Sequence, residues 1–379
     1  MIHSLFDDLR PYVQEEIMPA MQRITDSEYF PVMAQFIFPD KDVEEVRNIV
    51  RQIRTTEAFQ ELIMYYFNKV VIERYVDSFT YQGLDYLDPA KRYLFISNHR
   101  DIMLDSALMQ YMLFINGFQT TEITFGDNLM SSQLVVDIGK SNKMFKVIRS
   151  KNMRDFHKNS LHLSEYIRYT IKEKKESIWI AQRGGRTKDG NDATDQGIIK
   201  MFCMSEPSDP VRSADELNMV PVVISYQNET CDVLKTRELY LSRNEAKYVK
   251  QPYEDLHSIL TGITQPKGNL HICICEPVRR NELEEIRYNQ PNEFYKALSL
   301  LIDRRIYQNY KLFNNNYIAY DIRSGKDTYS AYYTPEEKAA FIERMEDKLR
   351  QVEGEKDILR AIFLGIYANP VDNQLRITP

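Results

Sequence analysis

The sequence predicts an α/β fold with a central, mostly parallel β-sheet flanked by helices, an N-terminal helical region and a helical C-terminal extension. Short β-rich runs alternate with helical runs from about residue 90, which is typical of a parallel sheet with helical crossovers. Helical patterns alone fill the first part of the chain, and they return from residue 291. We therefore predict three units, 1–85, 86–290 and 291–379.

The N-terminal region has the spacing of amphipathic helices. Apolar residues recur at helical intervals in 42–53, and 57–76 is a long amphipathic stretch without glycine or proline. No β-rich run interrupts this region, so we expect helices alone.

The central unit contains six predicted strands and three predicted helices. The strands are 92–97, 121–126, 145–149, 177–181, 219–225 and 269–275. The helices are 103–116, 155–174 and 253–262. In the C-terminal unit, Thr334 and Pro335 form a favourable start for a helix over 335–354. The tyrosine-rich stretch 307–333 has no clear period, so we expect it to pack as an extended chain.

Composition excludes some classes of protein. The 379 residues are 43% hydrophobic, enough for a substantial core, and 49 basic against 55 acidic residues argue against a nucleic-acid binder. No run of 18 apolar residues predicts a transmembrane helix, and the acidic N-terminus does not resemble a signal peptide. The four cysteines lack the spacing of metal ligands. We expect a cytoplasmic protein with reduced cysteines, either soluble or peripheral on the cytoplasmic membrane face.

Polar residues follow four of the predicted strands. These segments are 98–101, 149–151, 182–192 and 226–227. Because sites in open α/β sheets form beyond the carboxyl ends of the strands, we expect the four segments to gather at one edge. They supply a histidine, several cationic side chains and a loop with paired glycines.

The His99-Arg100-Asp101 tripeptide also occurs in the catalytic loop of protein kinases. That loop requires an asparagine five residues after the aspartate, and this chain has Ser106 there. No glycine-rich phosphate loop precedes the tripeptide and no Asp-Phe-Gly follows it. The kinase interpretation is therefore weak.

Acyl transfer requires a different set of groups. A hydroxyl that attacks a thioester needs a general base, which the imidazole of His99 provides. A carboxylate should orient the ring, and both Asp101 and Asp105 are close enough in sequence. We expect Asp101 to cap a helix that starts at Ile102, with Asp105 on its first turn. An anionic acceptor needs arginine or lysine, such as Arg149 or Arg186.

Four motifs in order resemble the glycerolipid acyltransferase superfamily, that is, the glycerol-3-phosphate and lysophosphatidate acyltransferases. They are NHRDIMLD at 98–105, FKVIRS at 145–150, IWIAQRGGRTKDG at 178–190 and VPVVISY at 220–226. Each contains or follows a predicted strand, and together they cover about 92–226. The single motifs are weak signals, whereas the ordered set is fairly specific. The resemblance implies the superfamily's fold for the α/β unit, which would then be the catalytic domain.

Two departures from the family pattern affect the expected site. The family places four residues between histidine and aspartate, whereas five separate His99 from Asp105. The apolar stretch after Asp105 matches the family, so we favour it over Asp101 as the partner of His99. In the third motif, Arg183 stands at the family's glutamate, which puts the identity of the acceptor in doubt.

The resemblance implies a bacterial-type enzyme of phospholipid biosynthesis. It would move a fatty acyl group from acyl-CoA or acyl carrier protein to a hydroxyl of a glycerol-phosphate or lysophospholipid acceptor, without a metal or redox cofactor. His99 would be the general base, with Asp105 or Asp101 as its partner. The residues expected to bind substrate are Asn98, Arg149, Arg183, Gly184, Gly185, Arg186 and Thr187. The alternative is a non-catalytic lipid- or partner-binding protein on the same scaffold.

Two surfaces have more than one interpretation. The basic residues between Lys140 and Arg186 are either a solvated helix face or a docking site for anionic headgroups or an acidic carrier protein. The apolar stretch 107–117 is interpreted mainly as core packing. Contact with an acyl chain or a membrane surface is the alternative.

Overall fold

The computed structural model describes residues 5–148, 152–243, 248–249, 251 and 253–377. Seven strands form one sheet in the order β1-β7-β6-β2-β5-β3-β4. Their bounds are β1 Ser78–Gln82, β2 Leu94–Ser97, β3 Glu122–Gly126, β4 Met144–Val147, β5 Ile178–Ala181, β6 Met219–Tyr226 and β7 Asn269–Ile274. Neighbouring strands are parallel except β6 and β7, which are antiparallel. The predicted α/β fold with a mostly parallel sheet is confirmed.

The central strands form because their apolar side chains are covered on both faces. All eight residues of β6 and all four of β2 are buried, which is typical of strands inside a parallel sheet. The six predicted strands match β2 to β7 to within a few residues. The expectation of helices alone before residue 85 is wrong, because the edge strand β1 pairs with β7. Its sequence, SFTYQ, is mostly polar and exposed, so it lacks the hydrophobic run of a buried strand.

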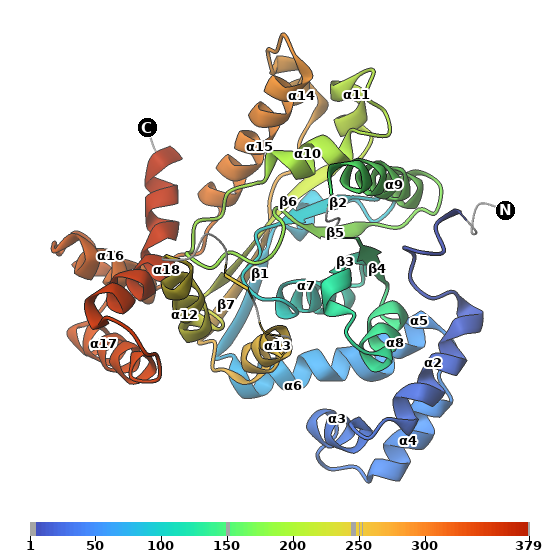
Figure 1. Ribbon diagram of the computed structural model, residues 1–379, viewed down its shortest axis with the longest axis horizontal. Helices are drawn as coiled ribbons and strands as arrows, with labels where there is room; N and C mark the ends of the chain where they lie inside the picture. The colour runs from blue at the N-terminus through green and yellow to red at the C-terminus, as the bar shows by residue number, and fades with distance from the viewer. Residues whose placement is uncertain (1–4, 149–151, 244–247, 250, 252, 378–379) are drawn as a thin grey trace.

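Helices cover both faces of the sheet (Figure 1). The helices before the first central strand are α2 Gln14–Asp26, α3 Phe30–Ile37, α4 Val43–Arg51, α5 Thr56–Phe59, the π-helix η1 Gln60–Met64 and α6 Tyr65–Tyr75, followed by the 3-10 helix η2 Leu84–Tyr86 after β1. The central helices are α7 Leu104–Ile115, η3 Asp127–Leu129, α8 Gln133–Ser141, α9 Met153–Lys172, α10 Gln196–Phe202, α11 Pro210–Asp215, α12 Asp232–Ser242, α13 Glu254–Thr264 and α14 Arg280–Glu285. The last ones are α15 Pro291–Gln308, α16 Asn314–Ser324, η4 Ser330–Tyr332, α17 Pro335–Leu349 and α18 Lys356–Ile377.

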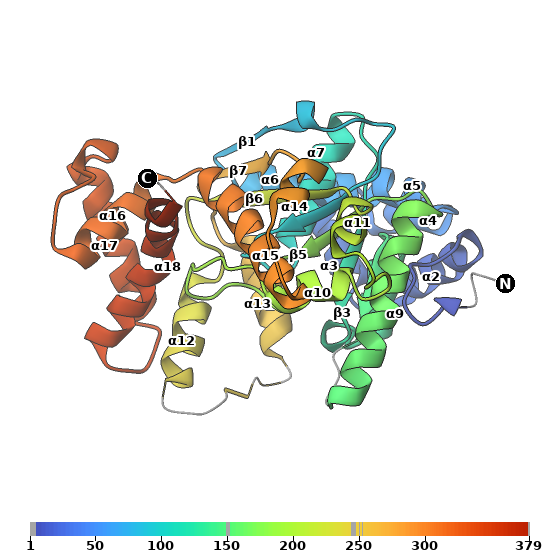
Figure 2. The same cartoon turned by 90° about the horizontal axis from the view of Figure 1, so that it is seen from above.

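Two hydrophobic cores lie against the two faces of the sheet. One joins the N-terminal helices and α7 to one face, and the other joins α9, α10 and α15 to the opposite face. Figure 1 shows these two layers below and above the strands. A third core lies within α16, α17 and α18, beside the sheet. The view in Figure 2 shows this C-terminal group at one end of the molecule.

The C-terminal unit differs from the expectation in one segment. The tyrosine-rich stretch was expected to be extended, yet 314–324 forms α16. Its sequence begins with three asparagines and so lacks a clear amphipathic period. The helix is stabilised instead by its contacts: Asn316 Oδ1 accepts from Phe313 N at 2.8 Å, and Asn316 Nδ2 donates to the Tyr367 carbonyl of α18.

No helix in the part of the chain that the structure describes is both long and apolar enough to cross a bilayer. The four cysteines are buried and none forms a disulfide.

Candidate active site

The polar segments after β2, β5 and β6 lie side by side because these strands are adjacent and parallel. His99 follows directly on β2, in the loop that leads to α7. The backbone N–H of Thr187, in the loop after β5, donates to the carbonyl of His99 at 2.7 Å. The expected meeting of these segments at one edge of the sheet is therefore confirmed for β2, β5 and β6.

His99 and Asp105 form a hydrogen-bonded pair. His99 Nδ1 lies 2.9 Å from Asp105 Oδ2. The same oxygen accepts the backbone N–H groups of Arg100 at 2.6 Å and Asp101 at 2.8 Å, while Oδ1 accepts the hydroxyl of Tyr226 at 2.8 Å. Asp105 is fully buried, and the side chain of His99 is 12% exposed.

This arrangement fixes the tautomer of His99. An ionised carboxylate only accepts hydrogen bonds, so Nδ1 must carry the proton and Nε2 is left with a free lone pair. Nε2 has no hydrogen-bond partner among the described residues. The indole of Trp179 packs edge-on against the imidazole, with 5.9 Å between ring centroids. A carboxylate thus binds the ring at Nδ1, and Nε2 on the other side can accept a proton.

The loop before α7 absorbs the extra residue between His99 and Asp105. The helix was expected to start at Ile102, but it begins at Leu104, after a bend over 101–103. Asp101 still caps it, since Oδ1 accepts the backbone N–H groups of Met103 at 3.0 Å and Leu104 at 2.9 Å. Of the two candidate partners, the structure therefore places Asp105 against His99 and Asp101 at the helix start.

Asn98 forms its hydrogen bonds within the protein. It is fully buried, and its amide pairs with both backbone groups of Ile224 at 2.8 and 3.1 Å and with Asp192 Oδ2 at 3.1 Å. The side chain therefore joins the end of β2 to β6. This orientation does not favour the expected contact of Asn98 with substrate, which stays a prediction.

Arg186 is the best candidate among these residues to bind an anion. Only 7% of the residue is exposed, and Nη2 donates to Ser258 Oγ of α13 at 2.9 Å. Nε and Nη1 are buried without a hydrogen-bond partner. Buried N–H groups of a charged side chain are rarely left unpaired, so these two are suited to an anionic ligand.

The other residues of the loop after β5 have different positions. Thr187 is buried, and its hydroxyl donates to Asp192 Oδ1 at 2.8 Å, a position that does not favour its expected contact with substrate. Arg183 is half-buried and has no ion-pair partner among the described residues. Gly184 is exposed, and Gly185 needs glycine for its φ of 86°, with open space around both. Arg149 lies outside the described residues.

A buried ionic network beneath the loop was missed by the sequence analysis. Arg100 Nη2 donates to Asp192 Oδ2 at 2.7 Å, and Nη1 lies 3.4 Å from Glu229. Lys235 Nζ donates to Glu229 Oε1 at 2.6 Å and to the carbonyl of Arg100 at 2.8 Å. Burial lowers the pKa of Arg100, but the two carboxylates raise it more and the net shift is upward. The network thus fixes the backbone next to His99.

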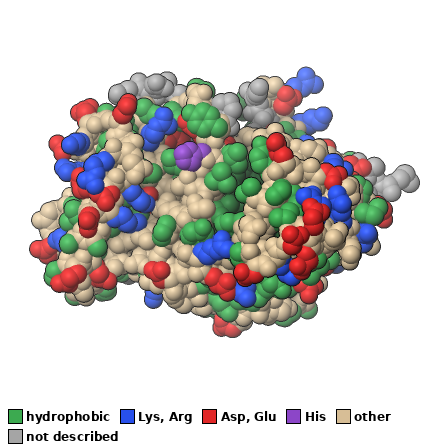
Figure 3. Space-filling view, turned by 90° about the horizontal axis from the view of Figure 1, so that it is seen from below, with side chains coloured by type: hydrophobic (Ala, Val, Ile, Leu, Met, Phe, Trp, Pro, Cys, Tyr) green, Lys and Arg blue, Asp and Glu red, His purple; other side chains and the backbone are tan. Residues whose placement is uncertain are grey.

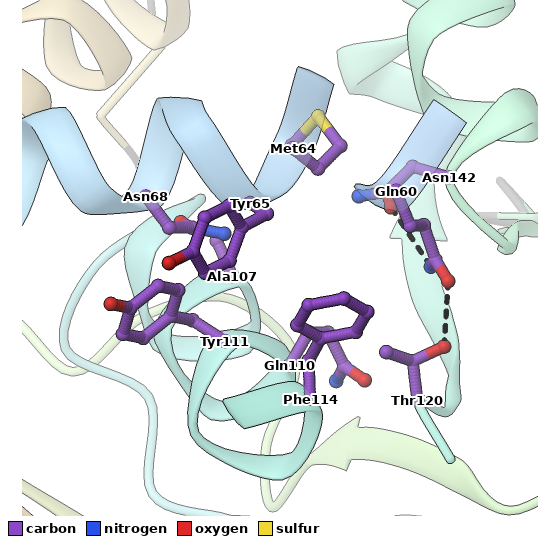
Figure 4. Close-up of a pocket in the computed structure, with 10 residues that line it drawn as sticks. All are labelled: Gln60, Met64, Tyr65, Asn68, Ala107, Gln110, Tyr111, Phe114, Thr120 and Asn142. Atoms are coloured by element: carbon purple, nitrogen blue, oxygen red, sulfur yellow. Dashed lines mark hydrogen bonds between the residues drawn. The ribbon is translucent and has the colours of Figure 1, made fainter. Parts of the chain in front are cut away.

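A small cavity lies between η1, α6 and α7 (Figure 4). Its volume is about 20 Å³, room for a water molecule but not for an acyl chain as it stands. Tyr65 and Tyr111 stack across it, with 5.5 Å between ring centroids. Most of α7 is buried in the core, as expected for 107–117, although Phe114 and Ile115 at its end are exposed.

Among the described residues, no group of histidine, cysteine, aspartate and glutamate side chains is arranged to hold a metal ion.

The match to a protein-family model agrees with the motifs. Residues 78–225 match the family model described as Acyltransferase. No curated protein matches the chain. Among solved structures, it is similar to the crystal structure of the 1-acyl-sn-glycerophosphate (LPA) acyltransferase PlsC from Thermotoga maritima, with 12% identity and a TM-score of 0.36 over 79% of this chain and 97% of that one. The matched segment 78–225 contains His99, Asp105 and Arg186.

Proposed function

We propose that this protein, whose residues 78–225 match the acyltransferase family model, transfers a fatty acyl group from a thioester to the hydroxyl of a phosphorylated glycerolipid acceptor. The observation that carries this proposal is the His99–Asp105 pair, in which Nδ1 is bound to a buried carboxylate and Nε2 has no hydrogen-bond partner among the described residues. A neutral imidazole in this setting is a suitable general base at physiological pH.

The proposed reaction proceeds through His99 in two proton transfers. Nε2 takes the proton of the acceptor hydroxyl as its oxygen attacks the carbonyl carbon of the thioester. The negative charge of Asp105 stabilises the imidazolium that forms. When the carbon–sulfur bond breaks, the imidazolium returns the proton to the departing thiolate. The products are the ester and a free thiol, and the enzyme regains its neutral histidine.

Arg186 supports a phosphorylated acceptor. Its two unpaired N–H groups match the acceptor oxygens of a phosphate, and the planar guanidinium suits two parallel hydrogen bonds. Arg183 adds a second positive charge in the same loop, at the position where the family has glutamate. We therefore favour an acceptor with a phosphate monoester near the reacting hydroxyl, because this group can carry two negative charges. Glycerol-3-phosphate and lysophosphatidate are examples. Arg149 remains part of this proposal on sequence grounds alone.

The donor is proposed to be acyl-CoA or acyl carrier protein. Both are anionic, and the described part of the basic stretch 140–186 includes Arg154 and Lys158, which are exposed on the first turns of α9. In Figure 2 this end of α9 projects from the body of the molecule. Exposed cations on a protein with a net charge of −6 would attract an anionic donor to this side.

Peripheral binding to a lipid surface is proposed to involve α13. Tyr253, Leu256 and Leu260 lie on one side of this helix at helical spacing and are 63, 56 and 54% exposed. Its other side contacts the site, through Ser258 and Gly262. Figure 3 shows hydrophobic side chains gathered in the middle of one face of the molecule. An apolar stripe on a helix that touches the site would bring an amphiphilic acceptor close to His99.

The experiment that tests the reaction is thiol release from palmitoyl-CoA, measured with and without glycerol-3-phosphate or lysophosphatidate. We expect release by the wild type only with an acceptor, and almost none by His99→Ala. His162→Ala is the matched control, because His162 also pairs with a carboxylate, at 3.1 Å from Asp8, but lies on α9. Acyl carrier protein thioesters provide the second donor.

Absence of thiol release by folded protein from either donor would contradict the proposed reaction. It would favour the alternative of a non-catalytic lipid-binding protein on this scaffold. One motive for that alternative is now weaker, because Asp105 reaches His99 in spite of the altered spacing. The substitution of the family's glutamate by Arg183 remains.

The lipid surface is tested with vesicles that contain anionic phospholipid. The fraction of protein that cosediments with the vesicles should be several-fold smaller for the double variant Leu256→Ser, Leu260→Ser than for the wild type. Each of the two substitutions removes an apolar contact with the bilayer. Leu300→Ser on α15 is the control, since Leu300 is equally exposed, at 58%, but belongs to another helix. Equal binding by all three proteins would exclude α13 as the contact.

A further inference from the structure

We propose that Tyr226 is a positioning residue of the active site, which acts on His99 through Asp105. This inference rests on the proposed acyl transfer and adds a third side chain to the His99–Asp105 pair. In the sequence, Tyr226 is the last residue of the fourth motif, 220–226, and its position beside a predicted strand gave it no role of its own. The structure places its hydroxyl 2.8 Å from Asp105 Oδ1, on the side of the carboxylate away from His99.

The length of β6 brings Tyr226 to this position. The pairing of β2 with β6 ends at Ser97 and Val222, but β6 continues to Tyr226. Asn98 extends the contact, since its amide pairs with both backbone groups of Ile224. The last residue of β6 therefore lies beyond the end of β2, beside the loop that joins His99 to α7.

The two oxygens of Asp105 have different surroundings. Oδ2 accepts from His99 Nδ1 and from two backbone N–H groups, which fix it in place. Among the residues that the structure describes, Oδ1 accepts only from Tyr226. Since Oδ2 is held in place, the carboxylate could still rotate about this atom. Among the described residues, the hydrogen bond from Tyr226 to Oδ1 is the one that prevents this rotation. It also withdraws negative charge from the group that faces the imidazole.

Tyr226 is suited to act as a permanent donor. The residue is 3% exposed, and burial, together with the nearby charges of Asp105, Asp101 and Glu229, raises the pKa of its hydroxyl well above the usual value. Asp101 approaches it from the loop before α7, Asp105 from the first turn of α7, and Glu229 from the segment after β6. The hydroxyl stays protonated over the pH range in which a histidine titrates, so its bond to Asp105 persists through the catalytic cycle.

The alternative is that Tyr226 only fills space at the end of β6. Phenylalanine keeps the ring and removes the hydroxyl, so Tyr226→Phe separates the two roles. Without its donor, Oδ1 is buried and unpaired, and more negative charge faces His99. The protonated ring then becomes more stable, and a higher pH is needed to produce the neutral base.

The experiment compares wild type, Tyr226→Phe and Tyr166→Phe. Tyr166 is the matched control, because its hydroxyl also donates to a fully buried carboxylate, at 2.6 Å from Glu122 Oε2, but lies on α9 outside the site. We expect Tyr226→Phe to lower kcat about tenfold, as for the loss of one hydrogen bond to a charged group, with KM for palmitoyl-CoA and lysophosphatidate changed less than about twofold. The acid limb of kcat/KM should move to higher pH. Tyr166→Phe should match the wild type in all three quantities.

A second measurement does not depend on turnover. The titration of the His99 ring, followed by NMR, should have its midpoint roughly half a pH unit or more higher in Tyr226→Phe than in the wild type. An unchanged midpoint together with an unchanged kcat would overturn the positioning role and leave the proposed acyl transfer intact. Conversely, a shifted midpoint in a protein that releases no thiol would support the contact between Tyr226 and the pair, while the proposed reaction itself would fail.

Discussion

The sharpest prediction separates the two aspartates that the sequence offered as partners of His99. In Asp105→Asn, the amide oxygen can still accept from the two backbone N–H groups and from His99 Nδ1, because these donors select the oxygen for the Oδ2 position. The amide nitrogen then lies next to the hydroxyl of Tyr226. This hydroxyl can rotate so that its oxygen accepts a hydrogen bond from the amide N–H. The hydrogen bonds are largely conserved, and the main loss is the negative charge beside the imidazolium.

The size of this loss follows from the geometry. His99 Nδ1 lies 2.9 Å from Asp105 Oδ2, so the centres of the two charges are about 4 Å apart once the charges are spread over the groups. At an effective dielectric constant of about 20, two unit charges at about 4 Å attract by about 4 kcal/mol. This energy is available in the transition state, when the ring is protonated, and corresponds to a loss of about 10³-fold in kcat.

Asp101→Asn provides the contrast. Asp101 Oδ1 accepts from Met103 and Leu104, and the amide oxygen of asparagine can keep both bonds. Asp101 Oδ2 has no hydrogen-bond partner among the described residues, so the amide nitrogen of asparagine replaces it without breaking a described hydrogen bond. Asparagine caps helices about as well as aspartate. We expect kcat within about threefold of the wild type, since neither the cap nor the His99 contact is changed.

The assay is thiol release from palmitoyl-CoA with lysophosphatidate as acceptor, at saturating concentrations of both. Circular dichroism melts of each variant establish that the comparison is between folded proteins. The assignment of Asp105 would be refuted by an Asp101→Asn enzyme that loses 100-fold or more while Asp105→Asn stays within tenfold. Equal losses in both variants would show that the charge of the whole loop matters, rather than the pair.

Three further predictions concern the surroundings of the pair. Arg186→Ala should raise KM for a phosphorylated acceptor about 10- to 100-fold, with little change in KM for palmitoyl-CoA. Initial-rate kinetics measure both constants, and an unchanged KM for the acceptor would contradict the role of Arg186. Gly262→Ala places a Cβ 2.2 Å from Asp101 Oδ2 and should lower the free energy of unfolding by about 1–3 kcal/mol in urea melts, whereas Gly184→Ala meets no atom within 4 Å and should not. Burial raises the pKa of Asp303 to about 6, so the folded protein binds this proton more tightly than the unfolded chain and loses stability as pH rises from about 4 through 6. Asp303→Asn should remove up to about 3 kcal/mol of that pH dependence in urea melts, and an identical pH profile in wild type and variant would disprove it.

The central strands could be predicted from the sequence because their signal is local. The runs that became β2 and β6 are continuously apolar, since side chains on both faces of these strands are buried. The edge strand β1 has no such signal, because only one of its residues is even half-buried and its order comes from pairing with β7. The helix α16 was missed for a related reason. Its stability derives from contacts with α18 and not from a period in its own residues.

The candidate site was predictable in position but not in orientation. His99 and Asp105 lie within six residues of each other, so a motif could identify them as a pair. Asn98 lies in the same motif and Thr187 in the third motif, yet both are buried and bonded to other residues of the protein, Asn98 to Ile224 and Asp192, and Thr187 to Asp192. The partners of Asn98 are distant in sequence, so no motif could predict its orientation. Tyr226 is 121 positions from Asp105, and no local pattern connects the two.

The buried network under the loop connects the C-terminal unit to the candidate site. Arg100 and Lys235 carry two positive charges, and Asp192 and Glu229 carry two negative ones, so the buried charges balance. Tyr310, at the end of α15, donates to Asp192 Oδ2 at 2.8 Å, and the backbone N–H of Glu229 donates to Tyr367 Oη of α18 at 3.0 Å.

Removing any one charge from this set would leave its partner buried and unpaired, which is more costly than losing an exposed ion pair. The backbone of Arg100 would then lose its anchors on the side opposite to Asp105. Because Arg100 is the neighbour of His99, we expect a change in Tyr310 or Tyr367 to reach His99 through these hydrogen bonds. On this reasoning, the C-terminal helices help to hold the His99–Asp105 pair in its geometry.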